Sequence, residues 1–255
     1  MIRTLISFSC LAILLSQLSA ANGANIVAPI SSTSTAGNAQ GPAPLRFYGS
    51  GGSRTQQVYD SSDFAGLTGP ITITAISFRP FTTPGAFSSN SVNISDTLIQ
   101  LSTTAASGEG ANPLSTTFAS NVGGNAKTVY SGALTLTTAA SGNAPYPFDY
   151  TINLQTPFTY NPAQGNLLLD LQIPTTATVS GAGFGFATFD TVNTASDGVY
   201  SVLDNSNGGA TTGTASTAGA ITQFTYTSSV PEPSSVLLAF VGIVVLPQFA
   251  ARRRS

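Results

Sequence analysis

The 255-residue chain has no histidine and no tryptophan, and its single cysteine is Cys10, in the first apolar segment. Acid–base catalysis near neutral pH most often uses histidine, and nucleophilic thiols, disulfides and zinc sites need cysteine. None of these groups is present after Cys10. We therefore expect a protein that is not an enzyme and binds no cofactor.

Charge is also scarce, because only 7% of the residues are charged. Between residues 25 and 230, four basic residues stand against nine acidic ones, which gives a net charge of −5. Nucleic-acid binding needs a cluster of cations that displaces counterions from phosphates. This composition excludes a nucleic-acid partner.

Carboxylates are the main remaining candidates for chemistry. A small glycosidase needs two of them, and the candidate pairs are Asp60 with Asp63 and Asp149 with Asp170. The missing tryptophans, which often form sugar platforms, argue against this function. We keep the glycosidase as the weakest of three functional hypotheses, behind a structural or interaction role and a carbohydrate-binding module.

Calcium binding is a second use for carboxylates. Asp190, Asp197 and Asp204 stand seven residues apart among glycines and asparagines, but the spacing matches no calcium loop. Aspartates in such segments more often initiate turns by bonding their own backbone. Glu109, between two glycines, is expected at a solvated loop tip. We predict no metal site.

The body of the chain alternates apolar and polar residues with a period of two. The clearest case is ITITAISF at 71–78, and similar runs begin near residues 55, 91, 127, 148, 166, 183 and 221. No 12-residue window has the spacing of an amphipathic helix. We predict an all-β fold, an antiparallel β-sandwich with jelly-roll-like topology over 45–228, preceded by a leader or edge strand over 25–44.

The most apolar run of the body is Leu167–Leu171, which predicts a central strand buried on both faces. An alternating segment, 148–160, precedes it, and the sequence NPAQG lies between them. We expect these two segments to pair as a long hairpin at the centre of the fold.

Carbohydrate binding is the leading ligand hypothesis. Tyrosines can stack on sugar rings, although in a sandwich they mostly pack in or around the core. A carbohydrate-binding module would carry several of them exposed on one concave face. The eight candidates are Tyr48, Tyr59, Tyr130, Tyr146, Tyr150, Tyr160, Tyr200 and Tyr226.

Residues 1–24 have the three parts of a secretory signal peptide. Arg3 precedes an apolar stretch over 5–18, and small residues follow. Cleavage could fall after Ala21, Gly23 or Ala24, of which we favour Ala24. The expected partners are the Sec translocon and signal peptidase.

The last 27 residues, 229–255, have a second tripartite pattern. Pro231, Glu232 and Pro233 follow Val230, and then come an apolar stretch over 236–251 and the basic residues Arg252, Arg253 and Arg254. Three arginines resist translocation and stay cytoplasmic. We predict a transmembrane helix at about 235–251, with the body held outside the cytoplasm.

This order of elements resembles the PEP-CTERM sorting signal of bacterial exopolysaccharide-associated proteins. The resemblance implies that an exosortase, a membrane-embedded transpeptidase-like cysteine protease, recognises Val230, Pro231, Glu232 and Pro233 and removes the helix. Pro247 and Gln248 interrupt the apolar stretch, so the length of the helix stays open. The alternative is an ordinary anchor that is never cut.

The body also resembles uncharacterised secreted β-sandwich proteins of this group, through segments such as ITITAISF, TVYSGALTL and PFTYNPAQGNLLLDL. No activity is attached to that group. We expect transient anchoring in the inner membrane, followed by a structural or interaction role at the cell surface or in the extracellular matrix. The alternative is a carbohydrate-binding module of the exopolysaccharide matrix, with polysaccharide as partner.

Overall fold

The computed structural model describes residues 23–40, 52–81, 91–108, 112–181 and 189–228. All regular strand pairs in these ranges are antiparallel, and no α-helix occurs in them. The all-β, antiparallel prediction is therefore confirmed. Short 3-10 helices, namely η2 (Ile30–Ser32), η3 (Ser61–Phe64), η4 (Phe118–Asn121) and η5 (Pro162–Gln164), connect the strands.

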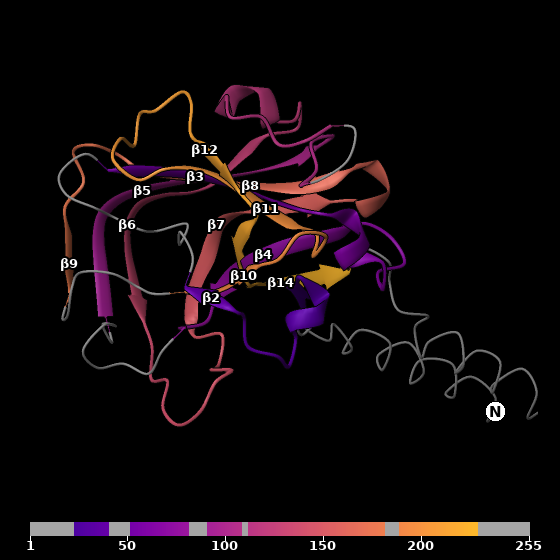
Figure 1. Cartoon of the computed structure of the whole chain (residues 1–255), viewed down its shortest axis with the longest axis horizontal. Helices are drawn as coiled ribbons and strands as arrows, with labels where there is room; N and C mark the ends of the chain where they lie inside the picture. Colours follow the sequence, from indigo (N-terminus) through magenta and orange to yellow (C-terminus); the bar gives the residue numbers. More distant parts are fainter. Residues whose placement is uncertain (1–22, 41–51, 82–90, 109–111, 182–188, 229–255) are drawn as a thin grey trace, which may run out of the picture.

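Three sheets make up the described body (Figure 1). The four-stranded sheet has the order β1 (Ala24–Ala28), β14 (Thr222–Ser228), β4 (Ile71–Phe78) and β7 (Tyr150–Tyr160). The seven-stranded sheet has the order β12 (Thr214–Ser216), β11 (Val199–Asp204), β3 (Ser53–Tyr59), β8 (Asn166–Ile173), β5 (Ser91–Thr104) and β6 (Lys127–Thr137), and β9 (Val179–Gly181) pairs with β5. The three-stranded sheet contains β13 (Ala218–Ala220), β10 (Asp190–Asn193) and β2 (Ala39–Gln40).

One hydrophobic core joins the two larger sheets. It includes Ile76 and Phe224 of the four-stranded sheet and Ile99, Leu169 and Leu171 of the seven-stranded sheet. Alternating residues of each strand supply these side chains, as the period of two requires. Figure 1 shows β3, β5 and β8 as a layer above β4 and β14.

Strand β8 is buried on both faces, as its apolar run predicts. Leu167, Leu169 and Leu171 enter the shared core, whereas Leu168 enters a second cluster on the outer face of the seven-stranded sheet. Phe118 and Leu114 cover Leu168 there. Strand β8 is central because it pairs with both β3 and β5, and the segment around η4 buries its outer face.

The predicted hairpin of 148–160 with 167–171 is wrong. Strand β7 pairs with β4 in one sheet, and β8 pairs with β3 and β5 in the other. The chain crosses between the sheets at η5 and Gly165, where the φ of 138° suits glycine. The Tyr160 hydroxyl donates to the Gly165 carbonyl across this turn at 2.9 Å.

Candidate functional site

Two arginines, the half-buried Arg54 and the buried Arg79, form the ion pairs of the described body. Arg54 on β3 donates from Nη2 to Asp170 Oδ2 at 2.7 Å and from Nε to Oδ1 at 3.1 Å. The Gln56 amide also donates to Asp170 Oδ2 at 2.7 Å, and Asn121 Nδ2 donates to Gln56 Oε1 at 2.8 Å. This network fixes the segment around η4 to the outer face of the seven-stranded sheet.

The second pair joins three distant segments of the chain. Arg79 Nε donates to Asp190 Oδ2 at 2.8 Å, and the two side chains are 1% and 3% exposed. The Gly37 N–H donates to Asp190 Oδ1 at 2.9 Å, and the guanidinium lies 5.0 Å from the ring centroid of Phe148. Asp190 therefore anchors the segment that follows β1. The residue types alone gave no indication of either pair.

The three aspartates weighed for calcium lie in different environments. Asp190 binds Arg79, whereas Asp204 Oδ1 accepts from the N–H groups of Ser206 and Asn207 at 2.8 and 2.9 Å. Asp197 Oδ1 accepts from the Val199 N–H at 3.0 Å. The turn interpretation is confirmed for Asp197 and Asp204. Within the described ranges, no three acidic, histidine or cysteine side chains gather closely enough to hold a metal ion.

Asp197 instead joins the carboxylate pair at η3. Asp63 is 4% exposed, and burial raises its pKa from 3.8 to about 6, to which the negative charges of Asp60 and Asp197 contribute. The Ile30 N–H donates to Asp63 Oδ1 at 2.9 Å and opposes this rise. Gly198, with φ 87°, closes the cluster, since a Cβ there would lie 3.0 Å from Asp63 Oδ2. Burial is the main cause of the raised pKa of Asp63, and the two neighbouring carboxylates add to it.

Asp149 and Asp170 bind separate partners. Asp149 Oδ2 accepts from the Thr138 hydroxyl at 2.8 Å, while Asp170 binds Arg54. Of the two carboxylate pairs considered for a glycosidase, Asp60 and Asp63 are the one that the fold brings together, through η3 and the Asp63 N–H bond to the Asp60 carbonyl at 3.0 Å. Glu109 lies outside the described residues.

The tyrosines are spread over both large sheets. Tyr59, Tyr150 and Tyr160 are fully buried, and burial raises the pKa of each. The remaining described tyrosines are the buried Tyr146 and the half-buried Tyr130, Tyr200 and Tyr226, on β6, β11 and β14; Tyr48 lies outside the described residues. They do not form the shared exposed face that a tyrosine-rich module would have.

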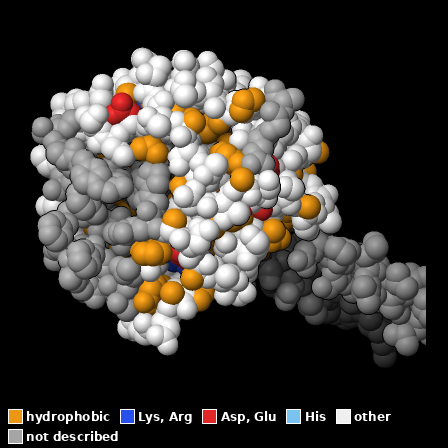
Figure 2. Space-filling view, viewed as in Figure 1, with side chains coloured by type: hydrophobic (Ala, Val, Ile, Leu, Met, Phe, Trp, Pro, Cys, Tyr) orange, Lys and Arg blue, Asp and Glu red, His pale blue; other side chains and the backbone are white. Residues whose placement is uncertain are grey.

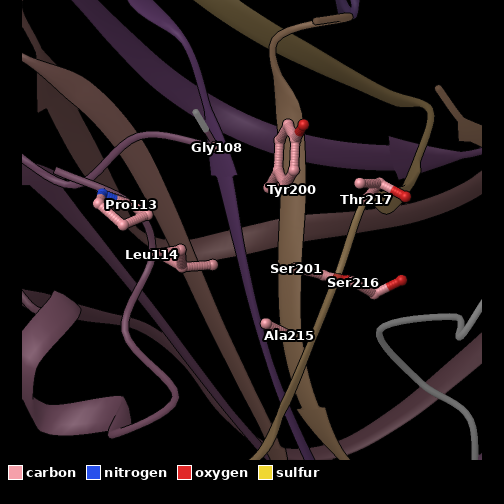
Figure 3. A pocket seen from close by; sticks show the side chains of 8 residues that line it. All are labelled: Gly108, Pro113, Leu114, Tyr200, Ser201, Ala215, Ser216 and Thr217. Carbon is pink, nitrogen blue, oxygen red and sulfur yellow. The ribbon is translucent and has the colours of Figure 1, made fainter. Parts of the chain in front are cut away.

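A small hollow lies beside Tyr200 on the outer face of the seven-stranded sheet (Figure 3). Its volume is about 210 Å³, and it is lined by Gly108, Pro113, Leu114, Tyr200, Ser201, Ala215, Ser216 and Thr217. Figure 3 shows the Tyr200 ring between Gly108 and Thr217. A Cβ at residue 108 would overlap this ring at 1.7 Å, so glycine is required there. The hydroxyls of Ser201, Ser216 and Thr217 hydrogen-bond within the protein, so the aromatic ring of Tyr200 is the feature of the hollow that suits contact with a sugar.

The outer face of the four-stranded sheet carries neutral side chains, most of them polar, although Val27 and Ser77 on this face are buried, Val27 against Val192 and Ile221. One row across β14, β4 and β7 is Gln223, Ser77 and Thr151, and another is Thr227, Thr72 and Thr159. The neighbouring row, Phe224, Ile76 and Ile152, points into the core. Figure 2 shows one face of the molecule, on which acidic and basic side chains are rare.

The two ends of the described body meet in the four-stranded sheet. Ala24 in β1 pairs with Tyr226 in β14, and Ser228 pairs with Ile71 in β4. The predicted signal cleavage after Ala24 would remove the first pair of β1, whereas cleavage after Ala21 would keep it. The cleavage site stays a prediction, and residues 1–22 lie outside the described residues.

Directly after Ser228, residues 229–254 match the model of the PEP-CTERM protein-sorting motif. The chain ends in a PEP-CTERM sorting motif. The resemblance of these residues is therefore confirmed, and the motif implies an exported, cell-surface protein that an exosortase sorts. No curated protein and no solved structure matches the chain.

The residues assigned to sorting lie outside the described part of the chain. They are Val230, Pro231, Glu232 and Pro233, with Arg252, Arg253 and Arg254. Their individual roles stay predictions, as does the helix at about 235–251. Among the residues that the structure describes, no helix is long and apolar enough to span a membrane.

Proposed function

We propose that, after export and exosortase processing, the PEP-CTERM protein serves at the cell surface or in the extracellular matrix as a structural or interaction component without catalysis. The observation that carries this proposal is the sorting motif, which follows the last strand of a folded body without a further domain between them. The folded body is therefore the part of the protein that sorting brings to the cell exterior.

The use of the ionisable groups supports a role without catalysis. Arg54 and Arg79 bind Asp170 and Asp190 in pairs that hold loops in place. Asp149 and Asp204 bind backbone N–H groups of their own loops. Each of these six side chains has a partner within the body, and these contacts stabilise the fold.

The neutral outer face of the four-stranded sheet supports the interaction role. Within a row, neighbouring threonine, serine or glutamine residues are separated by the distance between strands, about 4.8 Å. Hydroxyl and amide groups can form hydrogen bonds with neutral polymers. The strength of these bonds depends little on salt concentration, unlike that of contacts between charged groups. Such a face suits contact with uncharged matrix components.

The strand order supports a jelly-roll sandwich for the finer fold. With the added pair β11 and β12 left out, the order β1, β14, β4, β7 in one sheet faces β3, β8, β5, β6 in the other. Strands that alternate between two sheets in this way form the two Greek keys of a jelly roll. Sheet-to-sheet crossings such as η5 are a consequence of that topology.

Mass spectrometry of the native extracellular protein tests the processing. We expect a fragment that starts between Asn22 and Asn25 and ends close to Pro233, without the arginines. A protein that keeps Arg252 to Arg254 and stays in the membrane would instead be an ordinary anchored protein, and the proposal would be wrong.

Carbohydrate binding is the second candidate, favoured by the hollow beside Tyr200. We expect Tyr200→Ala to weaken retention on a neutral polysaccharide roughly five- to tenfold, because one aromatic stacking contact contributes about 1 kcal/mol. Affinity electrophoresis in gels that contain the polysaccharide measures this effect. Tyr130→Ala, on a different strand, is the matched control. Equal retention of both variants and the wild type would remove the hollow as a glycan site.

A further inference from the structure

The last strand of the body cannot be separated from its core. Strand β14 lies between β1 and β4 and pairs with both. The ring of Phe224 is fully buried, 5.0 Å from the ring of Tyr59 and 5.8 Å from that of Phe64. The Thr222 hydroxyl also shares a hydrogen bond with the Tyr59 hydroxyl at 2.7 Å. The core of the body therefore forms completely only when β14, which ends at Ser228, is in place between β1 and β4.

The spacer between this strand and Pro231 is very short. Two residues, Ser229 and Val230, separate Ser228 from Pro231. An extended chain advances at most about 3.6 Å per residue, so the spacer reaches roughly 11 Å. As long as β14 stays paired, an enzyme that acts on the motif must therefore work directly beside the four-stranded sheet.

Both terminal segments leave the body at the same end of that sheet. We call the paired residues Ala24, Ile71, Tyr226 and Ser228 the exit end. A strand as long as β14 spans about 24 Å, so termini at opposite ends of the sheet would hold the body between two distant tethers. At the exit end, the signal peptide and the sorting segment can both stay attached while the sheet forms.

We propose that the exosortase cuts a body that is already fully folded, with the exit end placed directly against the enzyme. This inference rests on the exosortase processing described above, and adds the state of the substrate and the surface that meets the enzyme. Strand β14 keeps its pairs with β1 and β4 during the cut. Cleavage then releases a finished domain, with a C-terminal tail of only a few residues beyond the sheet.

An engineered disulfide across β14 and β4 tests this order of events. Thr227 and Thr72 stand directly opposite each other near the exit end, and both are half-buried on the outer face. Opposite residues in antiparallel strands have Cα atoms about 4.5–5.5 Å apart, within the range for a disulfide. Apart from Cys10 in the predicted signal peptide, the chain has no competing thiol.

We expect the oxidised double variant Thr72→Cys, Thr227→Cys to be processed within twofold of the wild-type rate in cells that contain the exosortase. The single variant Thr227→Cys is the control for the substitution. A larger slowing of the locked precursor, reversed by a membrane-permeant reductant, would mean that β14 must separate first, and the inference would be overturned. A wild-type protein that is never shortened would instead contradict the proposed function.

A second measurement covers the case in which the disulfide does not form. In cells without the exosortase, the uncut precursor should give the same protease-resistant fragment as the processed protein. A precursor whose body is degraded while the processed form resists would also overturn the inference.

Discussion

Replacing Asp190 with alanine should lower the free energy of unfolding by about 3–5 kcal/mol. The change leaves the Arg79 guanidinium, which is 1% exposed, without its carboxylate partner. It also leaves the Gly37 N–H without the Asp190 oxygens to which it donates at 2.9 and 3.1 Å. Removing one member of a buried pair costs more than the pair contributes, because an uncompensated charge stays in the interior.

Urea unfolding at neutral pH, followed by tyrosine fluorescence, measures this loss. Asp96→Ala is the matched control, since it removes a carboxylate from the half-buried position 96 on β5 and should change stability by less than about 1 kcal/mol. If the Asp190 and Asp96 variants unfolded at the same urea concentration, the structural role assigned to the Arg79 pair would be wrong.

The double variant Arg79→Met, Asp190→Leu distinguishes the cost of an unpaired buried charge from the loss of packing at this position. With both charges removed, most of the stability should return, because an apolar pair of similar volume avoids the desolvation cost. The Gly37 N–H still loses its acceptor, so the recovery should fall short of the wild type. A double variant as unstable as Asp190→Ala would indicate that packing around Phe148 causes the loss.

Local alternation was enough to predict the all-β class and most of the longer strands, but it missed β10 and β11, and the run predicted near residue 183 falls largely outside the described residues. The run over 71–78 became β4, and Leu167–Leu171 became the doubly buried β8. The pairing partners could not be predicted in the same way. Nothing in NPAQG distinguishes a turn within one sheet from a crossing between two sheets, and the partners of β8 lie on distant strands, β3 and β5.

The candidate sites also differ in whether they depend on local sequence or on contacts between distant segments. The sorting motif is contiguous, and its order of residues was sufficient to recognise it. The pairs Arg54–Asp170 and Arg79–Asp190 join residues more than 100 positions apart, at 116 and 111. Asp197 likewise reaches Asp63 through the turn before β11 and not through the regular spacing of Asp190, Asp197 and Asp204. Only the fold could bring these groups together.

Asp63 should make the protein more stable in mild acid than at neutral pH. Its folded-state pKa of about 6 lies above the ordinary 3.8, so the folded protein binds a proton more tightly than the unfolded chain does. The resulting stabilisation is complete below about pH 4 and is lost as the pH rises through 6. A rise of this size corresponds to about 2–3 kcal/mol.

The variant Asp63→Asn should remove this dependence and raise the free energy of unfolding above pH 7 by about 1–3 kcal/mol. The amide oxygen can still accept from the Ile30 N–H, and the amide nitrogen meets Asp60 and Asp197 without repulsion. The measurement is the difference in unfolding free energy between variant and wild type from pH 4 to 8. Asp204→Asn is a control of opposite sign, because the N–H groups of Ser206 and Asn207 lower the pKa of Asp204, so its carboxylate stabilises the fold at neutral pH. A difference for Asp63→Asn that stays constant across this range would show that the cluster carries no excess repulsion.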